Sequence, residues 1–113
     1  MNLLTVRADK NGNMPRDITQ EFLDAARAGH YETAKKHWTA EGIQNYESNL
    51  AHGGFNGFCD KFTEYPNYKL TASTPSKGGR WLELFWYDEN NEKTKHGWMF
   101  FFRKIDDRWY IVQ

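Results

Sequence analysis

The sequence predicts an α+β fold, in which three N-terminal helices come first and an antiparallel meander of four strands follows. Three observations lead to this prediction. Apolar residues recur at helical spacing over residues 15–62, and aromatic and β-branched residues are concentrated in short runs over residues 68–112. Pairs of glycine, asparagine or aspartate residues separate these runs, as is typical of hairpin turns.

The first half of the chain carries clear signals for helix ends. Pro15 suits the first position of a helix, and Gly29 is placed to end that helix. Gly42 is expected to end the second helix, and Tyr65-Pro66 closes the helical half because a residue before proline avoids helical geometry. The predicted elements are a strand at Leu3–Val6, a helix from Pro15, a helix over about Tyr31–Ala40, further helical turns within Ile43–Leu50, and a third helix whose aromatic face carries Phe55, Phe58, Cys59 and Phe62.

Four strands and three tight turns are predicted for the second half. The strands are Tyr68–Thr74, Arg80–Tyr87, Lys95–Lys104 and Arg108–Val112, and the turns are Gly78-Gly79, Asn90-Asn91 and Asp106-Asp107. If the last two turns have two residues each, Phe102 lies opposite Ile111 and Glu83 lies opposite Trp98.

Both faces of this predicted sheet are strongly apolar. One face carries Trp81, Glu83, Phe85, Tyr87, His96, Trp98, Phe100, Phe102, Trp109 and Ile111, and the other carries Leu82, Leu84, Trp86, Met99, Phe101, Arg103, Tyr110 and Val112. The antiparallel sheet of a single domain ordinarily has one solvated face. We therefore expect one face to cover the helices and the other to pair with a second copy of the chain, as a homodimer.

Composition and charge limit the possible classes of protein. A chain of 113 residues suits a single domain, residues 1–113, with one core. Fifteen basic and fifteen acidic residues cancel, so no net charge draws the protein to nucleic acid or to an anionic membrane. Cys59 is the only cysteine, and no stretch has the pattern of a signal peptide or of a membrane span. We expect a soluble, cytoplasmic protein.

Two stretches of the sequence carry a family resemblance. Residues 22–42, FLDAARAGHYETAKKHWTAEG, have the pattern of a helix, a glycine and a second helix, and residues 97–113, GWMFFFRKIDDRWYIVQ, have that of a final hairpin. Both resemble the NTF2-like superfamily, whose cone fold is shared with ketosteroid isomerase and the SnoaL-like proteins, and the similarity is greatest to its small members. The resemblance implies a strongly curved antiparallel sheet around the helices, a cystatin-like cone with a pocket at its open end, and dimers formed through the sheets.

This resemblance leaves the activity open. The superfamily includes isomerases, dehydratases, hydrolases, small-molecule binders and assembly modules, so the fold does not select among them. Its enzymes usually place an acid–base aspartate, or an aspartate–histidine pair, in the pocket. The sequence has no unambiguous counterpart of these residues.

Glu83 is the strongest candidate for chemistry, because it is the one carboxylate set inside an aromatic strand. Apolar surroundings would raise its pKa and suit it to general acid–base catalysis; alternatively, it is exposed or pairs with a lysine. His96, on the same predicted face, could share a proton network with Glu83 or be a surface residue at a strand end. Tyr46 could donate a hydrogen bond to a carbonyl oxygen from the helical side, or be a core residue.

The predicted ligand site lies at the open end of the cone and gathers Trp38, Tyr46, Phe62, Glu83, Phe85, His96 and Trp98. The histidine spacing does not suit metal ligands, and neither a metal nor a cofactor is predicted. Three functions remain open: binding of a small apolar molecule, isomerase or dehydratase catalysis with Glu83 as the base, and assembly alone. A buried Glu83 beside an open cavity would favour catalysis, whereas a cone filled by Trp38, Trp98 and phenylalanines would favour assembly.

Overall fold

In the computed structural model, which describes residues 6–49, 51 and 53–113, helices come first and an antiparallel sheet follows, as predicted. The helices are α1 (Pro15–Arg27), α2 (Tyr31–Lys35), α3 (Ala40–Glu47), α4 (Gly54–Asp60) and the 3-10 turn η2 (Lys61–Thr63). The strands are β1 (Asn67–Ser76), β2 (Gly79–Tyr87), β3 (Lys93–Ile105) and β4 (Arg108–Ile111). They form one sheet in the order β1-β2-β3-β4, and each neighbouring pair is antiparallel. None of the described helices has the length and apolar character that crossing a membrane requires.

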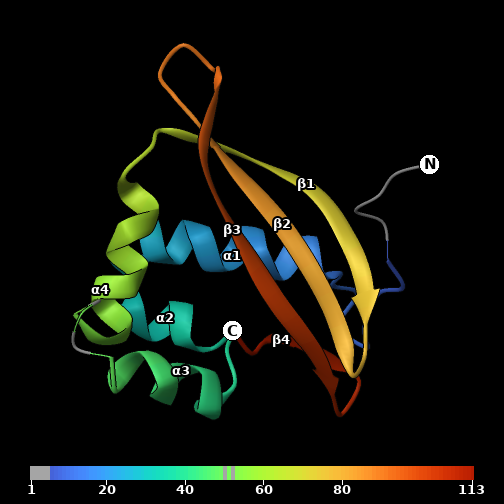
Figure 1. The fold of residues 1–113 in the computed structure, drawn as a ribbon. Coiled ribbons are helices and arrows are strands. Elements are labelled where there is room, and N and C mark those ends of the chain that lie inside the picture. The colour runs from blue at the N-terminus through green and yellow to red at the C-terminus, as the bar shows by residue number, and fades with distance from the viewer. Residues whose placement is uncertain (1–5, 50, 52) are drawn as a thin grey trace.

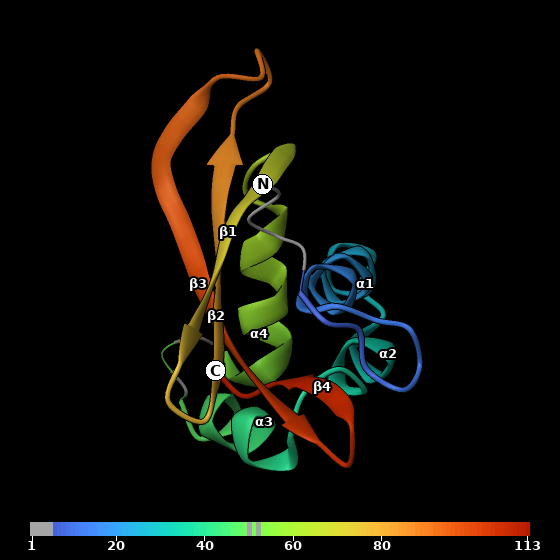
Figure 2. The same ribbon diagram turned by 90° about the vertical axis from the view of Figure 1, so that its right-hand side faces the viewer.

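The helices of the described residues all lie on one face of the curved sheet. Figure 1 shows α1 crossing behind the strands with α4 beside them, and Figure 2 shows the sheet edge-on with α1, α2 and α4 on the same side. We call the face toward these helices the inner face and the opposite one the outer face. This arrangement confirms the predicted α+β architecture.

Helix α1 begins and ends where its sequence predicts. Pro15 occupies the first helical turn, and the Asp17 carboxylate accepts a hydrogen bond from the main-chain N–H of Met14 (2.7 Å). Gly29 has a φ of 76°, the left-handed geometry that ends many helices. The predicted strand Leu3–Val6 lies outside the described residues except for Val6, which belongs to no strand.

The predicted second helix is wrong in extent, because the chain joins the sheet in the middle of it. Helix α2 ends at Lys35, and the residues that follow pair with β4. The N–H of Thr39 donates to the carbonyl of Ile111 (3.0 Å), and the N–H of Ile111 donates to the carbonyl of His37 (2.8 Å). The chain then starts α3, so the described residues form four α-helices and not three.

Gly42 was predicted to end a helix, but it lies inside α3. A side chain at this position would place its Cβ 2.6 Å from the carbonyl oxygen of Val112. The glycine therefore allows α3 to approach the C-terminal segment closely. This is a packing requirement, and it resembles a helix stop when the sequence is considered alone.

The hairpin between β3 and β4 is confirmed in both its turn and its register. Asp106 and Asp107 have φ values of 51° and 58°, the geometry of a two-residue turn that matches the twist of the strands. Phe102 pairs with Ile111, as predicted. The first hairpin turns at Lys77-Gly78, one residue before the predicted Gly78-Gly79.

The turn between β2 and β3 is longer than the predicted Asn90-Asn91 turn. It spans residues 88–92, and the Asp88 side chain organises it from within. Oδ1 of Asp88 accepts hydrogen bonds from the main-chain N–H groups of Asn90 (2.9 Å) and Glu92 (3.0 Å). A five-residue loop therefore replaces the two-residue turn.

This longer loop changes which side chains share a face. Glu83 lies opposite Met99, and Leu84 lies opposite Trp98, so the predicted pairing of Glu83 with Trp98 is wrong by one residue. The pairing of β2 with β3 has a further irregularity between Phe85 and Tyr87. Because side chains alternate along a strand, the slip exchanges the faces of β3 relative to β2.

Aromatic rings fill the space between the helices and the inner face. The fully buried Phe22 of α1 is central, with ring centroids 5.4 Å from Trp38, 5.7 Å from Phe62 and 5.9 Å from Phe100. Edge-to-face and offset contacts of this kind stabilise a packed interior. The interior of the cone around Phe22 is therefore largely filled by side chains.

Candidate functional site

A small cavity remains between the α4–η2 segment and the inner face of the sheet. Its volume is about 150 Å³, and it is half enclosed. We call it the ring cavity, and its lining residues are Phe58, Lys61, Phe62, Glu64, Tyr65, Trp86, His96, Gly97 and Trp98.

Helix and sheet both contribute rings to the ring cavity. Phe58 and Phe62 come from α4 and η2, and their centroids lie 5.4 Å and 6.1 Å from that of Trp98 on β3. Trp86 on β2 lies 5.7 Å from Phe62. Apart from the rim, the lining is rigid and apolar, since four aromatic rings form most of it.

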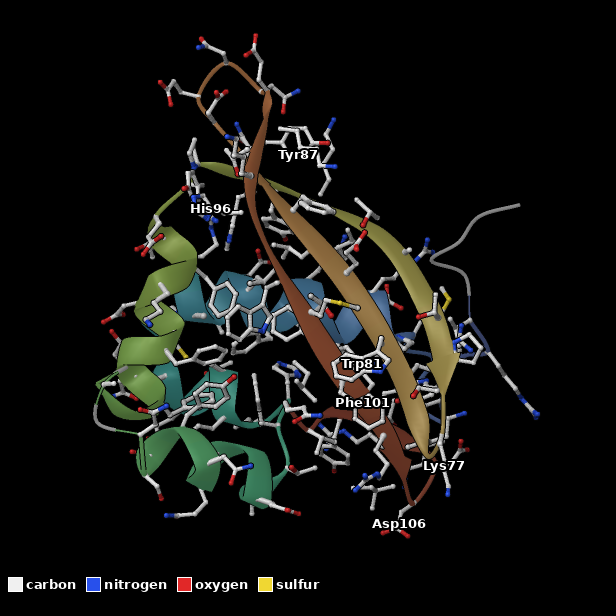
Figure 3. All side chains as sticks on the ribbon, viewed as in Figure 1. Lys77, Trp81, Tyr87, His96, Phe101 and Asp106 are labelled. Atoms are coloured by element: carbon white, nitrogen blue, oxygen red, sulfur yellow. The ribbon has the colours of Figure 1, made fainter. Side chains whose placement is uncertain are left out.

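The rim of the ring cavity is polar. His96, at the start of β3, stacks on Tyr65 with centroids 5.9 Å apart and an interplanar angle of 24°. In Figure 3 it lies on the side of the sheet toward α4. Lys61 and Glu64 complete the rim and bring one positive and one negative charge.

The structure places some of the predicted site residues at this cavity and others away from it. Phe62, His96 and Trp98 line it. Trp38 and Tyr46 lie in the neighbouring aromatic layer: Trp38 is 3% exposed, and Tyr46 stacks on Phe58, which is a cavity residue, at 3.9 Å. Burial raises the pKa of Tyr46, which keeps its hydroxyl protonated.

Glu83 and Phe85 do not share the cavity, because the register places both on the outer face. The Glu83 carboxylate accepts a hydrogen bond from the Thr71 hydroxyl (2.6 Å), and Phe85 is covered by Lys93, whose Nζ lies 3.9 Å from the ring centroid. His96 lies at the ring cavity on the inner face, so Glu83 and His96 are on opposite faces of the sheet and do not form the predicted proton network.

Several lining residues were not among the predicted site residues. Tyr65 was interpreted only as the residue that ends the helical half, and Trp86 was assigned to the face opposite Trp98. The aromatic spacing that predicted α4 included Phe58. Its i, i+4 relation to Phe62 was a usable signal, because such residues face the same way on a helix.

The indole nitrogen of Trp98 is buried and has no hydrogen-bond partner among the described residues, and the same holds for Trp38. An unpaired buried donor costs about 1–3 kcal/mol.

Among the described residues, no group of three histidine, cysteine or acidic side chains is arranged to hold a metal ion.

The outer face has a second, open hollow of about 440 Å³ around Gly97, bounded by Glu83, Phe85 and Met99 among others. Met99 is 48% exposed. Below it, Trp81 and Phe101 pack with centroids 4.9 Å apart, on the face turned away from the helices in Figure 3.

Comparisons with known proteins give matches of structure only. No protein-family model matches the sequence, and no curated protein matches it. A Rhodopseudomonas palustris protein that contains a SEC-C motif is similar with a TM-score of 0.60 and 12% identity, over 88% of this chain and 75% of that one. A Campylobacter jejuni protein described as an NTF2-like transpeptidase is similar with a TM-score of 0.54 and 14% identity, over 88% of this chain and 97% of that one. With helices followed by a curved antiparallel sheet in the same arrangement, the chain has the NTF2-like fold.

Proposed function

We propose that the protein binds a small, flat, largely apolar molecule in the ring cavity. The observation that carries this proposal is a half-enclosed space walled by Phe58, Phe62, Trp86 and Trp98. Clefts lined by aromatic side chains, with a few polar groups at the mouth, are the usual form of small-molecule sites. Here the stacked pair Tyr65 and His96 provides the mouth.

The size of the cavity limits the ligand to about one ring. A volume of about 150 Å³ is about half the lower limit for drug-sized ligands and similar to cavities that accept benzene. Polycyclic molecules are too large for it. For phenol, with seven heavy atoms, a Kd of about 1 mM corresponds to about 0.6 kcal/mol per atom, which is reasonable for so small a ligand.

Catalysis with Glu83 as the base receives no support from this geometry. The carboxylate lies on the outer face and hydrogen-bonds to Thr71, whereas the cavity lies on the inner face. No catalytic base is assigned to the ring cavity.

Ligand-observed NMR with phenol tests the proposal. We expect saturable binding to the wild type at about millimolar Kd, at least about tenfold weaker binding to Trp98→Leu because a wall is lost, and unchanged binding to Trp81→Leu. Trp81 is the matched control because it lies on the outer face. His96→Ala alters only the exposed rim and should change the affinity without unfolding the protein. Equal affinity of the wild type and Trp98→Leu, or no saturation, would contradict the proposal.

Assembly through the outer face is a second candidate function, favoured by the filled interior and by the exposed Met99. The proposed occupant is a second copy of the chain, with Met99 of one copy seated in the hollow around Gly97 of the other. Four strands of about nine residues span roughly 19 by 30 Å, on the order of 600 Å² before side-chain relief is counted. This approaches the roughly 800 Å² per partner of a standard interface.

A further inference from the structure

A separate cleft lies on the helical side of the molecule, between α1, the end of α2 and β4. It is open to solvent, with a volume of about 630 Å³, and it shares no residue with the ring cavity. Helix α1 contributes two carboxylates, Glu21 and Asp24. The opposite side carries Lys36, His37 and Arg108.

The charges of this cleft do not neutralise one another by direct contact. Within the described residues, Asp24, Lys36 and Arg108 form no ion pair. Glu21 approaches only the Nδ1 atom of His37, at 3.8 Å, and this is an ion pair only if His37 is protonated. The two carboxylates and the two permanent cations cancel in sum but stay separated in space.

The Arg108 guanidinium is held in place for binding. One of its nitrogens donates to the Tyr110 hydroxyl (3.2 Å) and another to the Lys36 carbonyl (3.4 Å). Its carbon also lies 4.7 Å from the centroid of the Tyr110 ring. A guanidinium fixed in this way keeps donors free for a carboxylate and loses little side-chain entropy on binding it.

His37 reports on the charge balance of the cleft. Its Nδ1 atom is buried and has no hydrogen-bond partner among the described residues. Burial lowers the pKa of His37, Arg108 and Lys36 lower it further, and Glu21 opposes them. His37 is therefore neutral near pH 7 and adds no charge to the two carboxylates and two cations.

We propose that this cleft binds a small zwitterion of the amino-acid class. The ligand carboxylate lies against Arg108 and Lys36, and its ammonium group lies against Glu21 and Asp24. A simple anion would also meet the two carboxylates, and a simple cation would meet the lysine and the arginine. Only a molecule with both charges is complementary to both sides.

Titration with 4-aminobutyrate, followed by amide and histidine-ring NMR signals, tests this proposal. We expect saturable shifts at the amides of Ala25 and Thr33, with butyrate and butylamine, which carry one charge each, binding at least about tenfold more weakly. The histidine-ring signals of His37, which contacts Glu21 and lies near Arg108, should shift with the same saturation curve as these amides.

Variants separate the cleft from nonspecific binding. Asp24→Asn, at an exposed position, and Arg108→Gln should each weaken 4-aminobutyrate binding about tenfold, whereas the charge-matched controls Asp106→Asn and Lys77→Gln should not. Thermal unfolding of each variant identifies any loss of binding that comes from a loss of folding. Equal binding of butyrate and 4-aminobutyrate, unchanged binding by Asp24→Asn, or no saturation at about 50 mM would overturn the proposal.

Discussion

The carboxylate of Asp9 connects the N-terminal loop to the last hairpin, and it is only 6% exposed. Its oxygens accept hydrogen bonds from the main-chain N–H groups of Asn11 (2.9 Å), Asn13 (3.0 Å) and Trp109 (3.0 Å). Burial raises the pKa of Asp9, but these hydrogen bonds and the charge of Lys104 together outweigh it, and the net pKa lies below the ordinary value.

Asp9→Asn should therefore lower the free energy of unfolding by about 2 kcal/mol at pH 7, as expected for hydrogen bonds to a charged group. Because the folded pKa is below the unfolded one, this contribution is present above about pH 4 and is lost as the pH falls through the folded pKa. Urea unfolding at several pH values measures the difference, which should shrink in acid. Asp106→Asn is the control, since asparagine tolerates the φ of 51° at that exposed turn. Equal stability of Asp9→Asn and the wild type at pH 7 would contradict this assignment.

Cys59 is fully buried on the inner side of α4, and burial raises the pKa of its thiol to about 12. The thiolate is the reactive form, so a rise of about three pH units lowers its population at pH 8 about a thousandfold. We expect Ellman's reagent to leave the native protein unmodified over minutes and to label it at once in urea. Rapid labelling of the folded protein would show that Cys59 is accessible.

At the scale of secondary-structure elements, local chemistry decided which turns were predictable. The Asp106-Asp107 turn depends on the conformations of its own two residues, and its prediction from sequence gave the correct register of β3 with β4. The loop over residues 88–92 depends instead on a side chain, because Asp88 binds the backbone two and four residues later. An Asn-Asn pair inside that loop resembles a two-residue turn, and the difference moved the register by one residue.

Long-range pairing limited the prediction of the helices in a similar way. Helix α1 was predicted because Pro15 and Gly29 mark its ends locally. The end of α2 is set by the bridge between Trp38 and Ile111, which lie far apart in the sequence. No local pattern indicates that bridge.

These two limits explain how much of the candidate site could be predicted. Phe62, His96 and Trp98 line the ring cavity, and the helix and the strand that carry them were predicted from the sequence. Glu83 and Phe85 were placed in the same site because the turn between β2 and β3 was predicted to have two residues. The actual register puts both residues on the opposite face. Composition predicted aromatic strands, but only the register decides which rings meet.

At the scale of the whole molecule, the outer face differs from the inner one in how its rings are protected. Trp81 packs on Phe101, which is only 7% exposed, whereas Met99, which lines the hollow around Gly97, is 48% exposed. A charge at Phe101 would disturb packing within one copy and so confuse unfolding with dissociation. A charge at Met99 separates dissociation from unfolding, because this exposed side chain contributes little to the stability of the folded monomer.

Met99→Glu should therefore convert a dimer into a folded monomer. We expect size-exclusion chromatography with light scattering to give twice the 13.4 kDa chain mass for the wild type at about 50 µM and the chain mass for the variant. Thermal unfolding of the diluted proteins should differ little, since an exposed substitution usually changes stability by less than about 0.5 kcal/mol. Gln20→Glu on the exposed side of α1 adds the same charge away from the outer face and should stay dimeric. A monomeric wild type, or a dimeric Met99→Glu, would exclude association through this face, because two glutamates buried against each other's apolar hollow cost far more than the interface gains.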